Sequence, residues 1–312
     1  MTERVKQYVK YRRNLGWKMS VESGELLRFA RFADNIDHRG PLTTELALRW
    51  ARSAVGCSRL YQSRRIEMVR CLGKYLQAFD PGTEIPPRGI LGPAHRRVQP
   101  HIYTPEEITA LLKAAASLHP LEGIRPRTYG TLVGLMASTG LRTCEALNLE
   151  RDDVDFSTGI LTVRHTKFRK SRLLPLHHSV SEQLESYATF RDRYHSNAPC
   201  SRFLLSQRGG PLLPSVVHWT FSKLRQQTGL ESSEKHRAPR LYDLRHTFAC
   251  RRLLEWYREG RDVNHVIAWL STYLGHVKVT DTYWYLTGIP ELLNIAAQRF
   301  ELFAHPVTRG AS

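Results

Sequence analysis

Five side chains in the C-terminal two thirds of the sequence could together handle a phosphodiester. Guanidinium groups can grip two nonbridging phosphate oxygens at once, a lysine can protonate a leaving oxygen, and a histidine can donate a hydrogen bond to phosphate. A tyrosine can attack phosphorus and hold it covalently. In chain order these residues are Arg142, Lys167, Arg245, His276 and Tyr285. The set could break and rejoin DNA without a metal ion.

Arg142 follows a turn at 138–141 and opens a segment that we predict to be helical through Leu147. The start of a helix supplies backbone N–H groups and the positive end of the helix dipole, and both favour a bound phosphate. An arginine in this position is more often an ordinary surface residue. The motif therefore becomes specific only together with the others.

Lys167 lies in the polar turn of a β-hairpin predicted over 159–176. A lysine there could carry a proton to a departing oxygen, and its charge favours phosphate. Lys170 and Arg172 stand close by in the same hairpin and compete for the role. A solvated basic hairpin tip is the alternative interpretation.

Arg245, three residues after Tyr242, could supply a second guanidinium group. Tyr242 could donate a hydrogen bond to a phosphate oxygen, but a phenol is a poor general base near neutral pH. On a helix His246 would point about 100° away from Arg245, so we interpret it as a packing residue.

Two tyrosines after His276, Tyr283 and Tyr285, could each be the nucleophile. On a helix their directions differ by about 200°, so only one of them can face the site. A lone histidine after a glycine is more often a turn or cap residue. His276 therefore also gains its meaning from the whole set.

The charge of the chain favours a polyanionic partner. The 312 residues carry a formal net charge of +17, and the basic excess extends over both the first hundred residues and the remainder. Nucleic acid is the commonest partner of such a protein. A basic protein kept soluble by its charge, or a ribosomal or membrane-surface binder, is the alternative.

Other classes find little support in the sequence. The five cysteines lack CxxC spacing, and no cysteine or carboxylate stands at ligand spacing around His177, His178 and His195. We therefore expect neither a disulfide framework nor a metal site. The polar N-terminal region and the lack of an apolar run of about 18 residues predict a cytoplasmic protein.

Turn signals and helical periodicity divide the chain. We expect a helical domain over 1–79, a Pro- and Gly-rich linker over 80–100, a mostly helical domain over 101–303 and a flexible tail over 304–312. The second domain should open with Thr104 as N-cap, Pro105 at the first helical position and Glu107 closing a capping box. The basic residues expected to contact a DNA backbone are Arg49, Arg52, Arg59, Arg64, Arg65, Lys74, Lys170 and Arg172.

The order and spacing of these motifs resemble the catalytic domain of the tyrosine recombinase (phage integrase) family over about 100–290. The matching positions are Arg142 after Thr-Gly-Leu, the hairpin Lys167, Arg245 after Asp-Leu, His276 after Leu-Gly, and Tyr285 nine residues later. The resemblance implies that Tyr285 is the nucleophile, that Lys167 is the general acid and that Glu145 orients Arg142. The family usually has a histidine where this chain has Tyr242, which leaves the general-base role open.

The resemblance also implies a fold and a reaction. The fold would be mainly α with a small β-hairpin or sheet, in two domains that clamp duplex DNA in a C shape. The reaction would be site-specific recombination through a 3′-phosphotyrosyl bond, without cofactor, by four protomers on two DNA sites that belong to a mobile element. A type IB topoisomerase, a catalytically decayed DNA-binding protein and a plain transcription factor are the alternatives.

Overall fold

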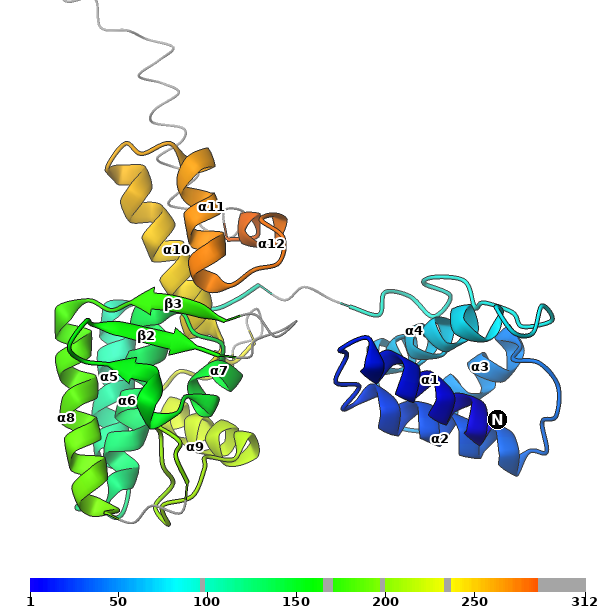
Figure 1. Cartoon of the computed structure of the whole chain (residues 1–312), viewed down its shortest axis with the longest axis horizontal. Coiled ribbons are helices and arrows are strands. Elements are labelled where there is room, and N and C mark those ends of the chain that lie inside the picture. The colour runs from blue at the N-terminus through cyan, green and yellow to red at the C-terminus, as the bar shows by residue number, and fades with distance from the viewer. Residues whose placement is uncertain (96–98, 165–170, 197–199, 233–236, 286–312) are drawn as a thin grey trace, which may run out of the picture. The chain divides into compact units, whose positions relative to one another are not determined.

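The computed structural model describes residues 1–95, 99–164, 171–196, 200–232 and 237–285 (Figure 1). The chain divides into two compact units, Met1–Val98 and Gln99–Ser312. Among the described residues no helix has both the length and the apolar character needed to cross a bilayer.

The N-terminal unit consists of four helices around one apolar core. They are α1 (Thr2–Asn14), α2 (Glu22–Asn35), α3 (Thr44–Arg52) and α4 (Arg59–Leu76). The Thr43 side chain caps α3 by accepting a hydrogen bond from the Leu46 amide at 3.2 Å. In the core the rings of Phe29 and Trp50 meet edge to face, with centroids 5.2 Å apart.

Arg65 lies inside this unit, so our prediction that it belongs to the exposed basic face is wrong. It is only 6% exposed, and its guanidinium group stacks 3.7 Å above the Trp50 ring. Its Nε lies 3.8 Å from a carboxylate oxygen of the buried Glu25. Its neighbour Arg64 is exposed, because consecutive residues on a helix point about 100° apart.

The segment expected to be a linker, residues 80–100, packs onto the N-terminal unit at Glu84 and Leu91. Glu84 accepts a hydrogen bond from the Thr44 amide at 2.7 Å, at the start of α3. Ser63 Oγ on α4 donates to the carbonyl of Leu91 at 2.8 Å. Residues 80–95 thus lack a helix but are tied to α3 and α4 by specific contacts.

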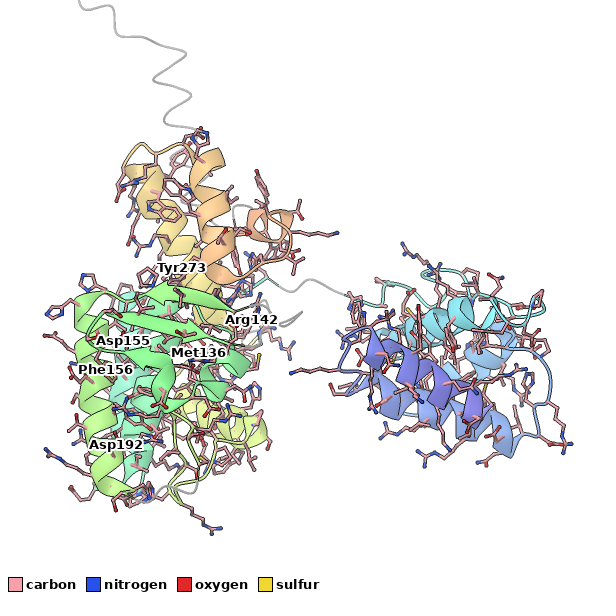
Figure 2. The ribbon with its side chains drawn as sticks, viewed as in Figure 1. Met136, Arg142, Asp155, Phe156, Asp192 and Tyr273 are labelled. Carbon is pink, nitrogen blue, oxygen red and sulfur yellow. The ribbon has the colours of Figure 1, made fainter. Side chains whose placement is uncertain are left out.

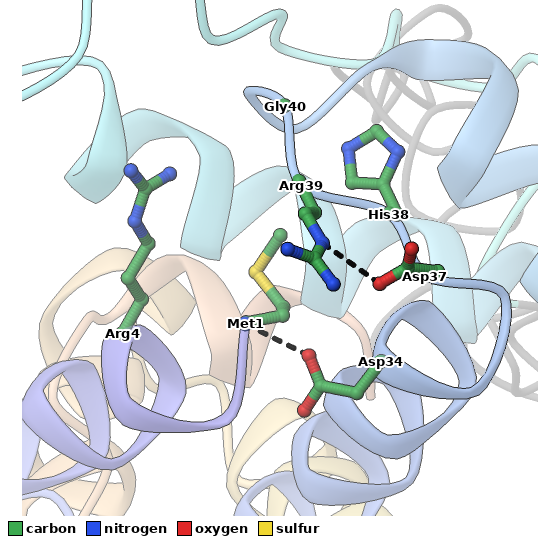
Figure 3. A pocket seen from close by; sticks show the side chains of 7 residues that line it. All are labelled: Met1, Arg4, Asp34, Asp37, His38, Arg39 and Gly40. Carbon is green, nitrogen blue, oxygen red and sulfur yellow. Dashed lines mark hydrogen bonds and ion pairs between the residues drawn. The ribbon is translucent and has the colours of Figure 1, made fainter.

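A polar hollow lies at the start of α1 and the end of α2 (Figure 3). The α-amino group of Met1 contacts Asp34 Oδ1 at 2.9 Å, and Arg39 Nε contacts Asp37 Oδ1 at 2.8 Å. Charges of both signs are thus already paired around this hollow.

The second unit begins with helices that form its main body. They are α5 (Pro105–Ala116), α6 (Ile124–Thr139), the short α7 (Thr143–Asn148), α8 (His178–Tyr194) and α9 (Pro214–Gln227). The predicted capping box is confirmed, since Thr104 Oγ1 accepts from the Glu107 amide and Glu107 accepts from the Thr104 amide.

A three-stranded antiparallel sheet covers one side of this body. A 3-10 turn (Arg151–Asp153) leads into β1 (Val154–Asp155), which pairs with β2 (Ile160–Val163), and β2 pairs with β3 (Arg172–Pro175). The predicted hairpin corresponds to β2 and β3, and β1 was not expected. Leu161 and Leu174 face each other in the register and enter the same core as Leu132 of α6.

The last described helices form a smaller core beside the main one. They are α10 (Asp243–Arg258), α11 (Val263–Leu274) and α12 (Thr280–Tyr283). In Figure 1, α10 and α11 extend beyond the ends of α5, α6 and α8. Leu244 belongs to the main core, whereas Leu253 packs with Leu270 in the smaller one. The first turns of α10 therefore lie at the junction between the two cores.

Candidate active site

The arginines of the site converge on the last turn of α11. Carbonyls at a helix C-terminus lack partners within the helix and carry the negative end of its dipole, so they attract cations. Here three consecutive carbonyls each accept a hydrogen bond from a different arginine. The pairs are Arg172 Nε with Tyr273 O at 2.8 Å, Arg245 Nη2 with Leu274 O at 2.8 Å, and Arg142 Nη2 with Gly275 O at 2.9 Å. Figure 2 labels Arg142 and Tyr273 in this region.

Gly275 makes this approach possible. Its φ is +69°, a backbone conformation that other residues rarely adopt. A Cβ atom at this position would stand 2.9 Å from Nη1 of Arg172. Any side chain would therefore strain the backbone and displace the arginine.

Arg142 immediately precedes α7 and is held by Glu145. One Glu145 oxygen accepts from the Arg142 amide at 3.0 Å, and the other accepts from its Nη1 at 2.6 Å. Burial raises the pKa of Glu145, but hydrogen bonds and charges from Arg172 and Arg142 outweigh burial and bring this pKa to about 2. Glu145 is thus a carboxylate at neutral pH and orients the guanidinium group of Arg142.

Arg245 stands in the first turn of α10 and is completely buried. Its Nη1 donates to the carbonyl of Gly140 at 2.7 Å, and its Nη2 lies 3.0 Å from Nε2 of His276. Its Nε is buried and has no hydrogen-bond partner among the described residues. Burial lowers the pKa of this guanidinium group, but an arginine still remains charged.

His276 connects Arg245 to α12. Its Nδ1 lies 2.7 Å from Oγ1 of the buried Thr282. Burial and the positive charges of Arg245 and Arg142 lower the pKa of His276 to about 4. The imidazole is therefore neutral at pH 7.

The structure distinguishes the two candidate tyrosines by burial. Tyr285 is 4% exposed, whereas Tyr283 is 44% exposed. The Tyr285 ring lies nearly parallel to that of His276, with centroids 5.9 Å apart. Burial raises the pKa of Tyr285, while the charge of Arg245 opposes this rise. Of the two, Tyr285 is the one in contact with the arginine–histidine cluster.

Tyr242 and His246 form the other wall beside Tyr285. The His246 ring lies 5.3 Å from the Tyr242 ring and 5.3 Å from the Tyr285 ring, between centroids. Its Nδ1 is buried without a partner in the described structure, and burial lowers the pKa of this histidine to about 4. Interpretation of His246 as a plain packing residue therefore missed its contact with Tyr285. The i, i+4 spacing from Tyr242 was the available signal, because such residues share one helix face.

The remaining predicted site residues fall into three groups. Lys167 and Lys170 lie outside the described residues. Arg172 is not free for DNA, in contrast to our expectation, because Nη1 and Nη2 contact Glu145 at 3.1 and 2.8 Å and Nε contacts Tyr273. The other predicted DNA-contact residues on α3 and α4 are exposed, as expected, and they are Arg49, Arg52, Arg59, Arg64 and Lys74.

The geometry defines a class of chemistry. The Arg245 guanidinium group and the neutral His276 imidazole lie beside the buried Tyr285 phenol, and Arg142 lies near both Arg245 and His276. This arrangement is suited to transferring a phosphoryl group to and from the phenolic oxygen. Within the described ranges no three His, Cys, Asp or Glu side chains cluster as a metal site. The fold and the site together define a tyrosine-type strand transferase.

Comparison with known proteins gives the family. Residues 102–288 match the model described as the phage integrase family. A putative integrase/recombinase, y4rB of Sinorhizobium fredii, is 41% identical over 303 residues, which cover 95% of this chain and 96% of the relative. A second protein of that organism, y4rE, is 35% identical and covers 95% and 94%. The chain therefore belongs to the phage integrase family, the tyrosine recombinases.

Solved structures share the fold. An integrase of the transposon Tn1549 in complex with transposon right-end DNA has a TM-score of 0.64 at 18% identity, and the match covers 98% of this chain and all of that one. The XerH recombinase in a post-cleavage complex with a difH substrate also has a TM-score of 0.64, at 17% identity, over 96% of this chain and 85% of that one. The predicted fold class, mainly helical with a small sheet, is confirmed.

Proposed function

We propose that this chain is a site-specific DNA recombinase in which Tyr285 is the nucleophile. The Tyr285 oxygen attacks the scissile phosphorus and its proton passes to water, so that an Oη–P bond forms, the bond to the 5′ oxygen breaks and a 3′-phosphotyrosyl linkage remains. Lys167 gives a proton to the departing 5′ oxygen. The observation that carries the proposal is the burial of Tyr285 beside Arg245 and His276.

Arg142 and Arg245 would neutralise the charge that develops on the nonbridging oxygens. Both are held by Gly275, Leu274 and Gly140 carbonyls and keep N–H groups that these contacts do not use. Donors fixed before the reaction stabilise a transition state without reorganisation at the moment of transfer. Tyr242, which is 37% exposed, would add a further hydrogen bond to the phosphate.

The second half of the reaction reverses the first. The 5′ hydroxyl of a partner strand returns its proton to Lys167 as it attacks phosphorus, the Oη–P bond breaks, and the phenolic oxygen takes up a proton from water. The bond energy is conserved in the phosphotyrosine, so neither ATP nor a metal ion enters the balance. Strand exchange needs two duplexes, and we propose four protomers on two sites. Duplex DNA is the proposed partner of the basic residues on α3 and α4. We accordingly propose that the protein is associated with DNA in the cytoplasm.

We further propose that the DNA belongs to a mobile element, because the fold is shared with a transposon integrase. The test uses a supercoiled plasmid with two directly repeated copies of the DNA that flanks the gene, incubated in EDTA without ATP. Recombination yields a smaller circle with a single joined site. Relaxation without the smaller circle would instead indicate topoisomerase activity, and binding without either product would indicate a DNA-binding protein that has lost catalysis.

A further inference from the structure

Arg172, the first residue of β3, joins three elements at the edge of the candidate site. Its side chain is 12% exposed. Its two terminal nitrogens contact both carboxylate oxygens of Glu145 on α7, and its Nε donates to the carbonyl of Tyr273 on α11. Such a two-pronged contact with a carboxylate fixes distance and orientation together.

These contacts close a ring of hydrogen bonds around Arg142. Arg142 contacts Glu145, Glu145 contacts Arg172, and Arg172 contacts the Tyr273 carbonyl. Two residues further along the backbone, the Gly275 carbonyl accepts from Arg142. Both anchors of the Arg142 guanidinium group, Glu145 and the end of α11, are therefore themselves held by Arg172.

We propose that Arg172 is a positioning residue for strand transfer, which acts by holding Arg142 in place without touching the DNA phosphate. This inference rests on the proposed function of the site. Misplacement of a catalytic group by about 1 Å can slow a reaction roughly a hundredfold, so a residue that fixes such a group can matter as much as one in contact with substrate.

Two other roles for Arg172 would give different effects on DNA affinity, stability and reaction rate. A phosphate-contacting arginine would contribute to DNA affinity, but both terminal nitrogens of Arg172 already contact the Glu145 carboxylate, which balances its charge. A merely structural ion pair would contribute to the stability of the fold and leave the rate of the folded fraction unchanged. A positioning residue contributes to the rate at constant affinity.

The test compares wild type, Arg172→Gln and the control Arg191→Gln. Arg191 on α8 is also a buried arginine of this unit, 5% exposed, and it donates to the backbone carbonyls of Arg202 and Phe203. None of these contacts involves a residue of the candidate site. The substrate is duplex DNA from the flanks of the gene, with the cleavage position first mapped by wild type. Cleavage is measured as the single-turnover rate of covalent adduct formation, and DNA affinity is measured separately.

We expect Arg172→Gln to form the adduct roughly 10- to 100-fold more slowly, with DNA affinity within about twofold of wild type. Arg191→Gln should lower the melting temperature but keep the wild-type rate. A second substrate carries a methylphosphonate at the mapped position, which removes the charge that Arg142 would neutralise. On it the deficit of Arg172→Gln should shrink by about tenfold, as should that of Arg142→Gln, because the transition state depends less on a guanidinium group.

Three results would overturn the inference. They are a wild-type rate in Arg172→Gln, a loss confined to DNA affinity, and a deficit that stays unchanged on the methylphosphonate while that of Arg142→Gln shrinks. If wild type itself forms no adduct, the proposed function fails first. That failure is distinct, because it appears before any variant is compared.

Discussion

Nη2 of Arg245 lies 3.0 Å from Nε2 of His276, and this contact fixes the protonation of the histidine. A guanidinium group can only donate, so Nε2 must accept and the ring proton must sit on Nδ1. Nδ1 in turn donates to Oγ1 of Thr282 at 2.7 Å. The imidazole is thus held neutral, with its lone pair directed to the arginine.

The stability of the protein should therefore fall as the pH drops below about 6.5. The pKa of His276 and that of His246 are both lowered to about 4 in the fold, chiefly by burial, from an ordinary value of 6.5. The unfolded chain binds these protons first, so the stability that the neutral rings contribute is complete above pH 6.5 and is lost as the pH falls toward 4. Urea unfolding between pH 7.5 and 4.5 measures this slope.

The control for this slope is His218, an exposed residue of α9. His246→Asn should reduce the pH dependence by about one proton, whereas His218→Asn should leave the slope unchanged, because an exposed ring is in water in both states. Equal slopes in wild type and His246→Asn would show that burial does not hold this ring neutral.

Substitution of Arg245 should destabilise the fold more than substitution of Arg142. Arg245→Gln leaves the carbonyls of Gly140 and Leu274 unpaired in a dry interior, which should lower the free energy of unfolding by about 2–4 kcal/mol. The Arg142 side chain is 26% exposed, so Arg142→Gln should lower the free energy of unfolding by only about 1 kcal/mol. Both variants should lose adduct formation, and denaturant titration with adduct assays checks the pair. A stable, active Arg142→Gln would remove Arg142 from the proposed site.

Tyr242 should contribute through its hydroxyl group alone. It is 37% exposed, so Tyr242→Phe should fold with near-normal stability. Loss of one donor to the phosphate should slow adduct formation by roughly 10- to 100-fold. Tyr242→His, which supplies a different donor, should recover most of the rate. If Tyr242→Phe reacts as fast as wild type, the hydroxyl group does not contact the phosphate.

Arg65 and Arg59 on α4 should behave differently despite their equal charge. Arg65→Ala removes a buried partner of Glu25 and Trp50 and should lower the free energy of unfolding by about 3 kcal/mol. Arg59→Ala, at an exposed position, should leave stability unchanged and reduce the salt dependence of DNA binding by about one phosphate contact. Melting curves and binding titrations at several salt concentrations measure both effects. The opposite assignment of effects would restore Arg65 to the DNA-binding face.

Local patterns in the sequence predicted local structure well. The capping box of Thr104 and Glu107 was predictable because both partners lie within one helical turn. The β2–β3 pairing was predictable because two short apolar runs flank a polar turn. Composition identified 80–95 as non-helical but could not reveal its contacts with α3 and α4, since these depend on chain folding.

Long-range contacts account for most of what the sequence did not indicate. We predicted Arg172 to be a DNA contact because the sequence does not show its true partners. These partners are remote in the chain, 27 residues away at Glu145 and 101 residues away at Tyr273. We predicted Arg65 to be exposed because it lies in a run of basic residues. Such a run does not show which arginine points into the core. The sequence favoured Tyr285 over Tyr283 because of the spacing typical of the family. The burial of Tyr285 supports our proposal that it is the nucleophile.

Covalent trapping tests the central claim most directly. Wild type, Tyr285→Phe and Tyr283→Phe are incubated in EDTA with labelled DNA from the flanks of the gene, and SDS-resistant protein–DNA adducts are measured. Tyr285→Phe keeps the buried ring and removes only the hydroxyl group, so the fold should be retained. We predict an adduct with wild type and with Tyr283→Phe, and none with Tyr285→Phe. An adduct that persists in Tyr285→Phe and disappears in Tyr283→Phe would contradict the account.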